Sequence, residues 1–165
     1  MHAHALNDLH SNLQPGMKAL DIGSGSGYLA VAMAQMVGDK GKVIGIEHIK
    51  ELFDLSLVNI AKHHADLIKS KQLEMYCGDG RKGFAKEAPF DAIHVGAAAQ
   101  PAVADVLSKQ LKIGGKMVIP VEVEKGDQIF REYVKAKDGK VSFTNRVQVR
   151  YVPLTSEDKQ RNQNK

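Results

Sequence analysis

Short, almost wholly apolar runs alternate along the chain with longer amphipathic segments, as far as about residue 121. The runs have the length and composition of strands that are buried on both faces, as parallel strands are. They occupy 17–20, 42–47, 73–80 including the turn that follows the strand, 90–97 and 116–121. Between them, apolar residues recur at helical spacing over 2–13, 29–37, 49–63 and 101–111. This succession predicts an α/β fold: a doubly wound, mostly parallel sheet with helices on both faces, and a switch point between the first and fourth strands.

Beyond residue 127 the hydrophobic period changes. Residues 128–137 and 140–151 alternate apolar and polar positions on either side of Asp138-Gly139, which predicts a C-terminal antiparallel hairpin. We predict a single domain over 1–155, because a chain of 165 residues suits one hydrophobic core. We expect the polar stretch 156–165 to be disordered and 65–71 to be a connecting loop.

The first strand runs into a glycine-rich turn, LDIGSGSGYLA at 20–30. Glycines let the backbone turn sharply and bring a ligand close to main-chain N–H groups at a helix N-terminus. Asp21 is placed to accept a hydrogen bond from an amine of that ligand. A nicotinamide dinucleotide site needs glycines at i, i+2 and i+5, whereas the third glycine here comes one residue early. The spacing is similar to that of S-adenosylmethionine-binding turns, so we predict cofactor contacts from Asp21, Gly23, Ser24, Gly25, Ser26 and Gly27; a turn without a ligand is the weaker alternative.

Three other strands end in polar groups at the same predicted edge of the sheet, where doubly wound folds bind ligands. Glu47 ends the second strand, 20 residues past Gly27, and can accept both ribose hydroxyls of an adenosine. Asp79 with Gly80 follows the third strand and is a candidate for adenine's exocyclic amine. The fourth strand carries His94, Val95 and Gly96, for which a substrate contact stays open beside the commoner role of a hydrogen-bonded core histidine.

Composition and charge narrow the class of protein. Hydrophobic residues make up 43% and charged residues 25%, which is typical of a soluble globular protein. No apolar run is long enough to span a membrane, and the N-terminus lacks the pattern of a signal peptide. The single cysteine, Cys77, excludes an internal disulfide and favours a reducing compartment, so we predict a cytoplasmic protein. His63 and His64 have no Cys, Asp or His partner at ligand spacing nearby, and we predict no metal site.

The net charge of +4 is concentrated in the last third of the chain. A basic segment can indicate a nucleic-acid or acidic protein partner. Here the lysines are spread out with few aromatic residues among them, which favours solvated edge strands. We therefore predict no nucleic-acid or membrane partner, and a monomer.

Together these segments resemble one family. The glycine turn, MHAHAL at 1–6, GKVIGIEHIKEL at 41–52, GDGR at 78–81, APFDAIHVGAAA at 88–99 and YVPLT at 151–155 are similar to protein-L-isoaspartate (D-aspartate) O-methyltransferases over nearly the whole chain. The resemblance implies methyl transfer from S-adenosylmethionine to the free carboxylate of isoaspartyl and D-aspartyl residues in damaged proteins. The ester promotes succinimide formation, which begins repair.

The resemblance also implies cofactor contacts at His2, Ser26, Glu47 and His48, at Asp79 with Gly80, and at Thr155. The family more often has Asp where Glu47 stands. It carries a substrate-binding serine a few residues before the Met-His-Ala run, which places that serine upstream of Met1 in this chain. We therefore expect an N-terminally truncated member with no catalytic residue identified in the chain.

Methyl transfer to a carboxylate needs no strong base, because the acceptor is already ionised at neutral pH. It needs the oxygen, the methyl carbon and the sulfur held in line. Three alternatives stay open: an isoaspartyl methyltransferase, an S-adenosylmethionine-binding fragment with little or no turnover, and a nicotinamide oxidoreductase, which the glycine spacing disfavours.

Overall fold

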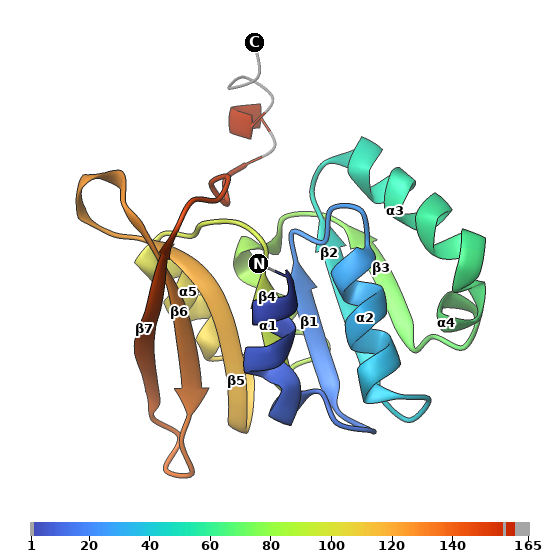
Figure 1. Ribbon diagram of the computed structural model, residues 1–165, viewed down its shortest axis with the longest axis horizontal. Helices are drawn as coiled ribbons and strands as arrows, with labels where there is room; N and C mark the ends of the chain where they lie inside the picture. Colours follow the sequence, from blue (N-terminus) through green and yellow to red (C-terminus); the bar gives the residue numbers. More distant parts are fainter. Residues whose placement is uncertain (1, 157, 161–165) are drawn as a thin grey trace.

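The computed structural model describes residues 2–156 and 158–160, apart from the side chain of Lys125. Seven strands form one sheet in the order β3-β2-β1-β4-β5-β6-β7 (Figure 1). Strands β1 to β5 run parallel to one another, β6 is antiparallel to β5, and β7 is antiparallel to β6. The bounds are β1 Lys18–Ile22, β2 Lys42–Glu47, β3 Leu73–Cys77, β4 Phe90–Val95, β5 Leu111–Glu122, β6 Gln128–Lys135 and β7 Val141–Val149.

This topology confirms the predicted doubly wound sheet and its C-terminal hairpin. The chain builds outward from β1 to β2 and β3, then returns to place β4 on the other side of β1. The switch point therefore lies between β1 and β4, as predicted. In open α/β sheets ligands bind at such a point, outside the carboxyl ends of the strands.

The helices cover the sheet unequally. Figure 1 shows α1 (His2–Leu9) and α2 (Tyr28–Val37) in front of the strands, and α5 (Pro101–Ser108) behind them. Helices α3 (Lys50–His63) and α4 (Ala65–Lys69) extend the front layer. Short 3-10 helices follow α1 at His10–Asn12, β3 at Gly80–Lys82 and β5 at Glu124–Gly126.

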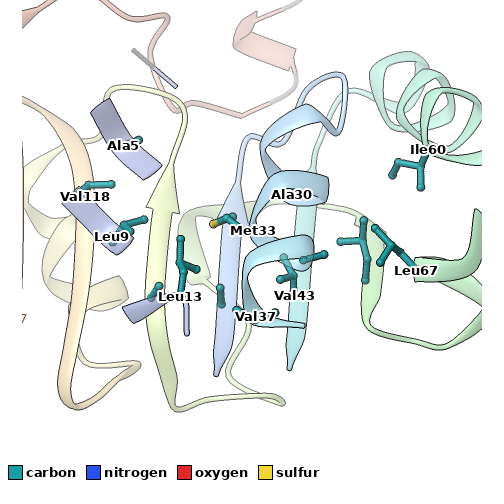
Figure 2. Close-up of a cluster of buried hydrophobic side chains, with 14 of the residues drawn as sticks. Ala5, Leu9, Leu13, Ala30, Met33, Val37, Val43, Ile60, Leu67 and Val118 are labelled. Atoms are coloured by element: carbon teal, nitrogen blue, oxygen red, sulfur yellow. The ribbon is translucent and has the colours of Figure 1, made fainter. Parts of the chain in front are cut away.

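Two hydrophobic clusters hold these layers together. The front cluster packs apolar side chains of α1 to α4 on the sheet (Figure 2). The rear cluster packs α5 on the other face of β1, β2, β4 and β5. Every residue of β4 is buried, and in β1 only the first residue is partly exposed, as expected for central parallel strands. This packing fixes the carboxyl ends of β1 and β4 side by side.

Three local predictions differ from the structure. Residues 65–69 form α4, not a loop, because Leu67 reaches the front core one helical turn after α3 ends. The helix from Pro101 ends at Ser108, not at Leu111, because Leu111 pairs with Phe90 as the start of β5. The first helix gives way at His10 to a 3-10 turn, which still buries Leu13.

Two predictions fall partly on residues outside the described part of the chain. The single domain over 1–155 begins at Met1, which is not among the described residues, so its first boundary stays a prediction. Of the segment expected to be disordered, 158–160 are helical, whereas 157 and 161–165 lie outside the described residues.

The C-terminal segment crosses the carboxyl edge of the sheet (Figure 1). Ala98 donates its N–H to Val152 and accepts from the Leu154 N–H, at 2.8 and 2.6 Å. These hydrogen bonds hold residues 152–154 beside the end of β4. Among the described helices, none has both the length and the apolar character needed to cross a membrane.

Candidate cofactor and substrate site

The glycine turn between β1 and α2 is held by its own backbone. Gly23, Gly25 and Gly27 take positive φ angles of 75°, 51° and 83°, which a side chain would strain. The N–H groups of Gly23 and Ser24 donate to the Ile46 carbonyl at 2.9 and 3.1 Å, and the Gly27 N–H donates to the Ser24 carbonyl. The turn is therefore tied to β2 before any ligand binds.

Glu47 connects the end of β2 to two other parts of the site. Its Oε2 accepts the Gly25 N–H and its Oε1 accepts the Ile49 N–H, each at 2.9 Å. The side chain is buried, so these hydrogen bonds offset the cost of burying a charge. Each carboxylate oxygen keeps a second lone pair, and Glu47 remains able to accept from a ribose hydroxyl.

Asp21 and His94 form a buried pair across β1 and β4. Nδ1 of His94 lies 2.7 Å from Oδ1 of Asp21, and since a carboxylate only accepts, Nδ1 carries the hydrogen. Oδ2 of Asp21 is buried with no hydrogen-bond partner in the described structure, and so is the Ser24 hydroxyl. A buried charged oxygen without a partner is costly. These two groups therefore fit a ligand that carries a donor, such as an amine.

Two cavities meet over the glycine turn. The first, of about 170 Å³, lies over Glu47 and is closed by the C-terminal segment. The second, of about 160 Å³, contains Asp21 and His94. Gly23, Gly25 and Gly96 line both. The two cavities thus adjoin at these three glycines, which we call the waist of the site.

The structure brings most of the predicted site residues into these cavities. Gly23, Gly25, Glu47, His48, Gly80 and Gly96 line the first, and His2, Asp21, Gly23, Ser24, Gly25, Ser26, His94 and Gly96 line the second. His2 stacks on Tyr28 with ring centroids 5.6 Å apart, which forms one wall of the second cavity.

Four predicted residues lie outside the described linings of both cavities. Gly27 lines a separate groove of about 370 Å³ between α2 and α3, and Val95 belongs to the rear core. Thr155 follows Leu154, which does line the first cavity. Asp79 is flanked by the lining residues Gly78 and Gly80, and its carboxylate binds the Arg81 guanidinium at 2.7 Å. That hydrogen bond lowers the pKa of Asp79, so the carboxylate is ionised.

The start of the chain carries one prediction that the structure does not test. The resemblance places the family's substrate-binding serine upstream of Met1, and Met1 itself lies outside the described residues. The position of that serine therefore stays a prediction, and so does the expectation that the chain contains no catalytic residue. The described part of the N-terminal run begins at His2, which does line the second cavity.

Residues that sequence analysis missed close the first cavity. Pro153 and Leu154 line it from the C-terminal segment, and Leu52 lines it from α3. Gln160 also lines it, and its Oε1 lies 2.6 Å from His48 Nε2. Nothing in a polar C-terminal stretch indicates such a contact; only the YVPLT motif pointed to this part of the chain.

Known proteins are similar to this chain in sequence and in fold. The family model described as "Protein-L-isoaspartate(D-aspartate) O-methyltransferase" matches residues 1–159. The chain belongs to this family. A Caenorhabditis elegans protein-L-isoaspartate O-methyltransferase is 50% identical, covering 99% of this chain and 72% of the relative. Protein-L-isoaspartate O-methyltransferase 1 of Arabidopsis thaliana is 48% identical, covering 97% and 69%.

A solved structure is similar over most of this chain. A Plasmodium falciparum protein described as a protein-L-isoaspartate O-methyltransferase, crystallised with S-adenosyl-L-homocysteine, superposes with a TM-score of 0.85. It is 34% identical, and the match covers 95% of this chain and 74% of that one. Family membership thus agrees with the glycine spacing, which disfavoured a nicotinamide site.

Proposed function

We propose that this protein transfers a methyl group from S-adenosylmethionine to the free carboxylate of isoaspartyl and D-aspartyl residues in damaged proteins. One observation supports this above the others: the two-part cavity has an acceptor for a ribose at one end and an unpartnered buried carboxylate oxygen at the other. An adenosine joined through sulfur to an amino acid carries ribose hydroxyls at one end and an ammonium group at the other, so it matches these two acceptors. The family assignment supplies the acceptor class.

We place the adenosine in the first cavity. The Glu47 carboxylate would accept the ribose hydroxyls, and the adenine would lie among Gly78, Gly80 and Leu154. A Cβ on Gly80 would lie 2.4 Å from Cγ2 of Ile22, so this wall needs glycine. Asp79 and Thr155 stay candidates for contacts at the ends of the adenosine. For Asp79, this would require that one of its carboxylate oxygens be shared with Arg81.

We place the methionine part in the second cavity. The unpartnered Oδ2 of Asp21 would accept from the α-ammonium group, and the Ser24 hydroxyl is free to donate to the cofactor carboxylate. The sulfur joins the two parts of the molecule, so it would lie at the waist formed by Gly23, Gly25 and Gly96. Because that wall is main chain, the methyl group would be left uncovered on its open side.

When bound, the sulfonium supplies an electrophilic methyl carbon with a neutral thioether as leaving group. A substrate carboxylate oxygen would form the new bond to this carbon while the carbon–sulfur bond breaks and its electron pair passes to sulfur. No proton moves, which fits a site with no nucleophile–base pair in the described part of the chain. The protein contributes alignment, which can account for about 7–11 kcal/mol of a barrier.

The deciding experiment is transfer of labelled methyl from S-adenosylmethionine to an isoaspartyl peptide, beside the same peptide with an ordinary aspartyl residue. We expect transfer to the isoaspartyl peptide alone. Binding of S-adenosylhomocysteine and of NADH is measured on the same sample, and only the former should bind. Cofactor binding without transfer to either peptide would contradict the proposed activity and favour a binding fragment.

We also propose that the protein acts on its protein substrates as a cytoplasmic monomer, without nucleic acid. The lone cysteine supports a reducing compartment, and the spread of lysines offers no continuous basic stripe. Light scattering after gel filtration should give one species near 18.0 kDa. A species of twice that mass would contradict the monomer.

A further inference from the structure

His94 presents one ring nitrogen that the buried pair with Asp21 does not use. The side chain is only 5% exposed, and Nδ1 is committed to Asp21. Nε2 has no hydrogen-bond partner among residues 2–156 and 158–160, and it is not among the fully enclosed unpartnered atoms. Since His94 lines the second cavity, Nε2 is the part of the ring that remains available to a ligand.

The ring lies beside the waist where the sulfonium would be. Asp21 and His94 are direct partners in the parallel register of β1 and β4, so their side chains leave the same face of the sheet. A Cβ built on Gly96 would lie 3.5 Å from Cε1 of His94 and 2.9 Å from the Gly23 carbonyl oxygen. The edge of the ring that carries Cε1, next to Nε2, is therefore close to the glycines that both cavities share.

We propose that Nε2 of His94 binds the carboxylate of the isoaspartyl substrate, with Asp21 as the residue that positions the ring. The proposal rests on the proposed function. The imidazole would bridge two carboxylates: Nδ1–H donates to Asp21, and Nε2–H donates to the oxygen of the substrate that does not attack. Both ring nitrogens donate in this bridge, so the ring carries a positive charge.

The charges around the second cavity explain why a bridging imidazolium would help the substrate carboxylate to bind. Asp21 is buried, and a second carboxylate that enters beside it meets a like charge where the effective dielectric constant is lower than in water. Glu47 adds another negative charge in the adjoining cavity. An imidazolium between Asp21 and the incoming carboxylate replaces that repulsion with two attractive contacts. The other imidazole in the described lining, His2, is exposed and stacked on Tyr28.

The bridge also predicts which substrate oxygen reacts. A carboxylate held through one oxygen by Nε2–H has its second oxygen free, and the fixed ring limits the directions in which that oxygen can point. Asp21 holds Nδ1, and Cε1, the carbon between the two ring nitrogens, faces Gly96, where a Cβ would lie 3.5 Å from it. Alignment of this kind raises the rate without a proton transfer.

The test is His94→Asn. The asparagine amide nitrogen occupies nearly the position of Nδ1 and can still donate to Asp21, whereas nothing replaces Nε2. We expect KM for the isoaspartyl peptide to rise about 10- to 100-fold, the range for losing one charge-assisted hydrogen bond. Affinity for S-adenosylhomocysteine should stay within about twofold, because the cofactor contacts remain. His10→Asn, at an exposed histidine that lines neither cavity, is the matched control and should leave both unchanged.

Peptide binding to the S-adenosylhomocysteine complex, by calorimetry, separates this proposal from the proposed function. If wild type binds the peptide but transfers no methyl group, the proposed activity fails while the His94 contact is still measured. If His94→Asn binds peptide as wild type does, the contact is wrong. An equal loss of cofactor affinity would reassign Nε2 to the cofactor's own carboxylate and also overturn it.

A second variant, His94→Gln, distinguishes loss of the proposed contact from a disturbance of the fold. Its amide reaches the level of Nε2 but leaves Oδ1 of Asp21 unpaired. We expect it to recover part of the peptide affinity that His94→Asn loses, at some cost in thermal stability. A purely structural histidine would give the reverse order: His94→Asn near wild type in peptide binding and His94→Gln worse. That order would overturn the proposal.

Discussion

At the scale of single residues, Glu47 does more than end a strand. One carboxylate holds the N–H of Gly25 in the glycine turn and the N–H of Ile49 at the start of α3. The position of Glu47 at the end of β2 was predictable from the sequence, since an acid there is typical of ribose binding. The double hydrogen bond was not, because it depends on how the glycine turn folds back over β2.

Glu47→Gln should therefore weaken cofactor binding, because it removes a hydrogen bond that holds the backbone of the site in place. The amide oxygen can accept only on one side, so one of the two buried N–H groups loses its acceptor, at a cost of about 1–3 kcal/mol. We expect S-adenosylhomocysteine affinity to fall at least tenfold and the melting temperature to fall by a few degrees. Asp54→Asn, which removes an exposed ion pair with Lys50 on α3, is the control. Unchanged affinity for Glu47→Gln would rule out the assigned ribose site.

Gly96 is a second residue whose identity is set by close approach. A Cβ there would meet the Gly23 carbonyl oxygen at 2.9 Å, and a backbone atom in the glycine turn cannot move aside as a side chain can. We expect Gly96→Ala to destabilise the fold by about 1–3 kcal/mol, as overpacking does, and to lower cofactor affinity. Gly78→Ala, whose Cβ would meet nothing within 4 Å, should leave the unfolding free energy unchanged. Equal stability of both variants in urea titration would contradict this reading.

At the scale of elements, the amino-terminal edge of the sheet has a different role from the carboxyl edge. Lys42 at the start of β2 contacts Glu74 of β3 at 2.9 Å and Glu87 at 3.1 Å, and Lys18 of β1 also reaches Glu87. Hydrogen bonds from Tyr76 and then Lys42 lower the pKa of Glu74, and Lys42 lowers that of Glu87. This cluster joins three strands far from the cavities, which points to stability and not to chemistry.

The pKa directions predict how stability depends on pH. Both carboxylates have a lower pKa folded than unfolded, so their contribution is complete above about pH 5, the range above the unfolded value. It is lost as the pH falls through the folded values. The groups are partly exposed, so we expect only about 1 kcal/mol in total. Glu87→Gln should flatten the pH dependence of unfolding between about pH 5 and 3, whereas Asp138→Asn in the hairpin turn should not. Parallel curves for wild type and Glu87→Gln would refute the assignment.

At the scale of the whole molecule, the spacing of apolar residues along the chain was enough to predict the succession of strands and helices, the hairpin and the switch point. It failed where a short segment is shaped by what it packs against. Residues 65–69 are too few and too polar to show a helical stripe, yet Leu67 is buried. The predicted helix at 101 ran three residues too long, because apolar Leu111 suits a helix and a strand equally, and its pairing with Phe90 decides. The same division holds for the site. Motifs pointed to the glycine turn and Glu47, but the closure by residues 152–154 and Gln160 depends on tertiary contacts.

That closure leads to a prediction about the whole chain. The C-terminal segment is tied to Ala98 by two backbone hydrogen bonds, and its far end reaches His48 through Gln160 over the first cavity. Gln160 belongs to neither hydrophobic cluster, so Gln160→Ala should leave the melting temperature unchanged. It should raise the dissociation rate of S-adenosylhomocysteine several-fold, because the side chain that closes the adenosine cavity is gone. Gln148→Ala, on the exposed edge strand β7, is the matched control. If stopped-flow dissociation is the same for both variants, the segment lines the cavity without retaining the cofactor, and release is controlled elsewhere along the site.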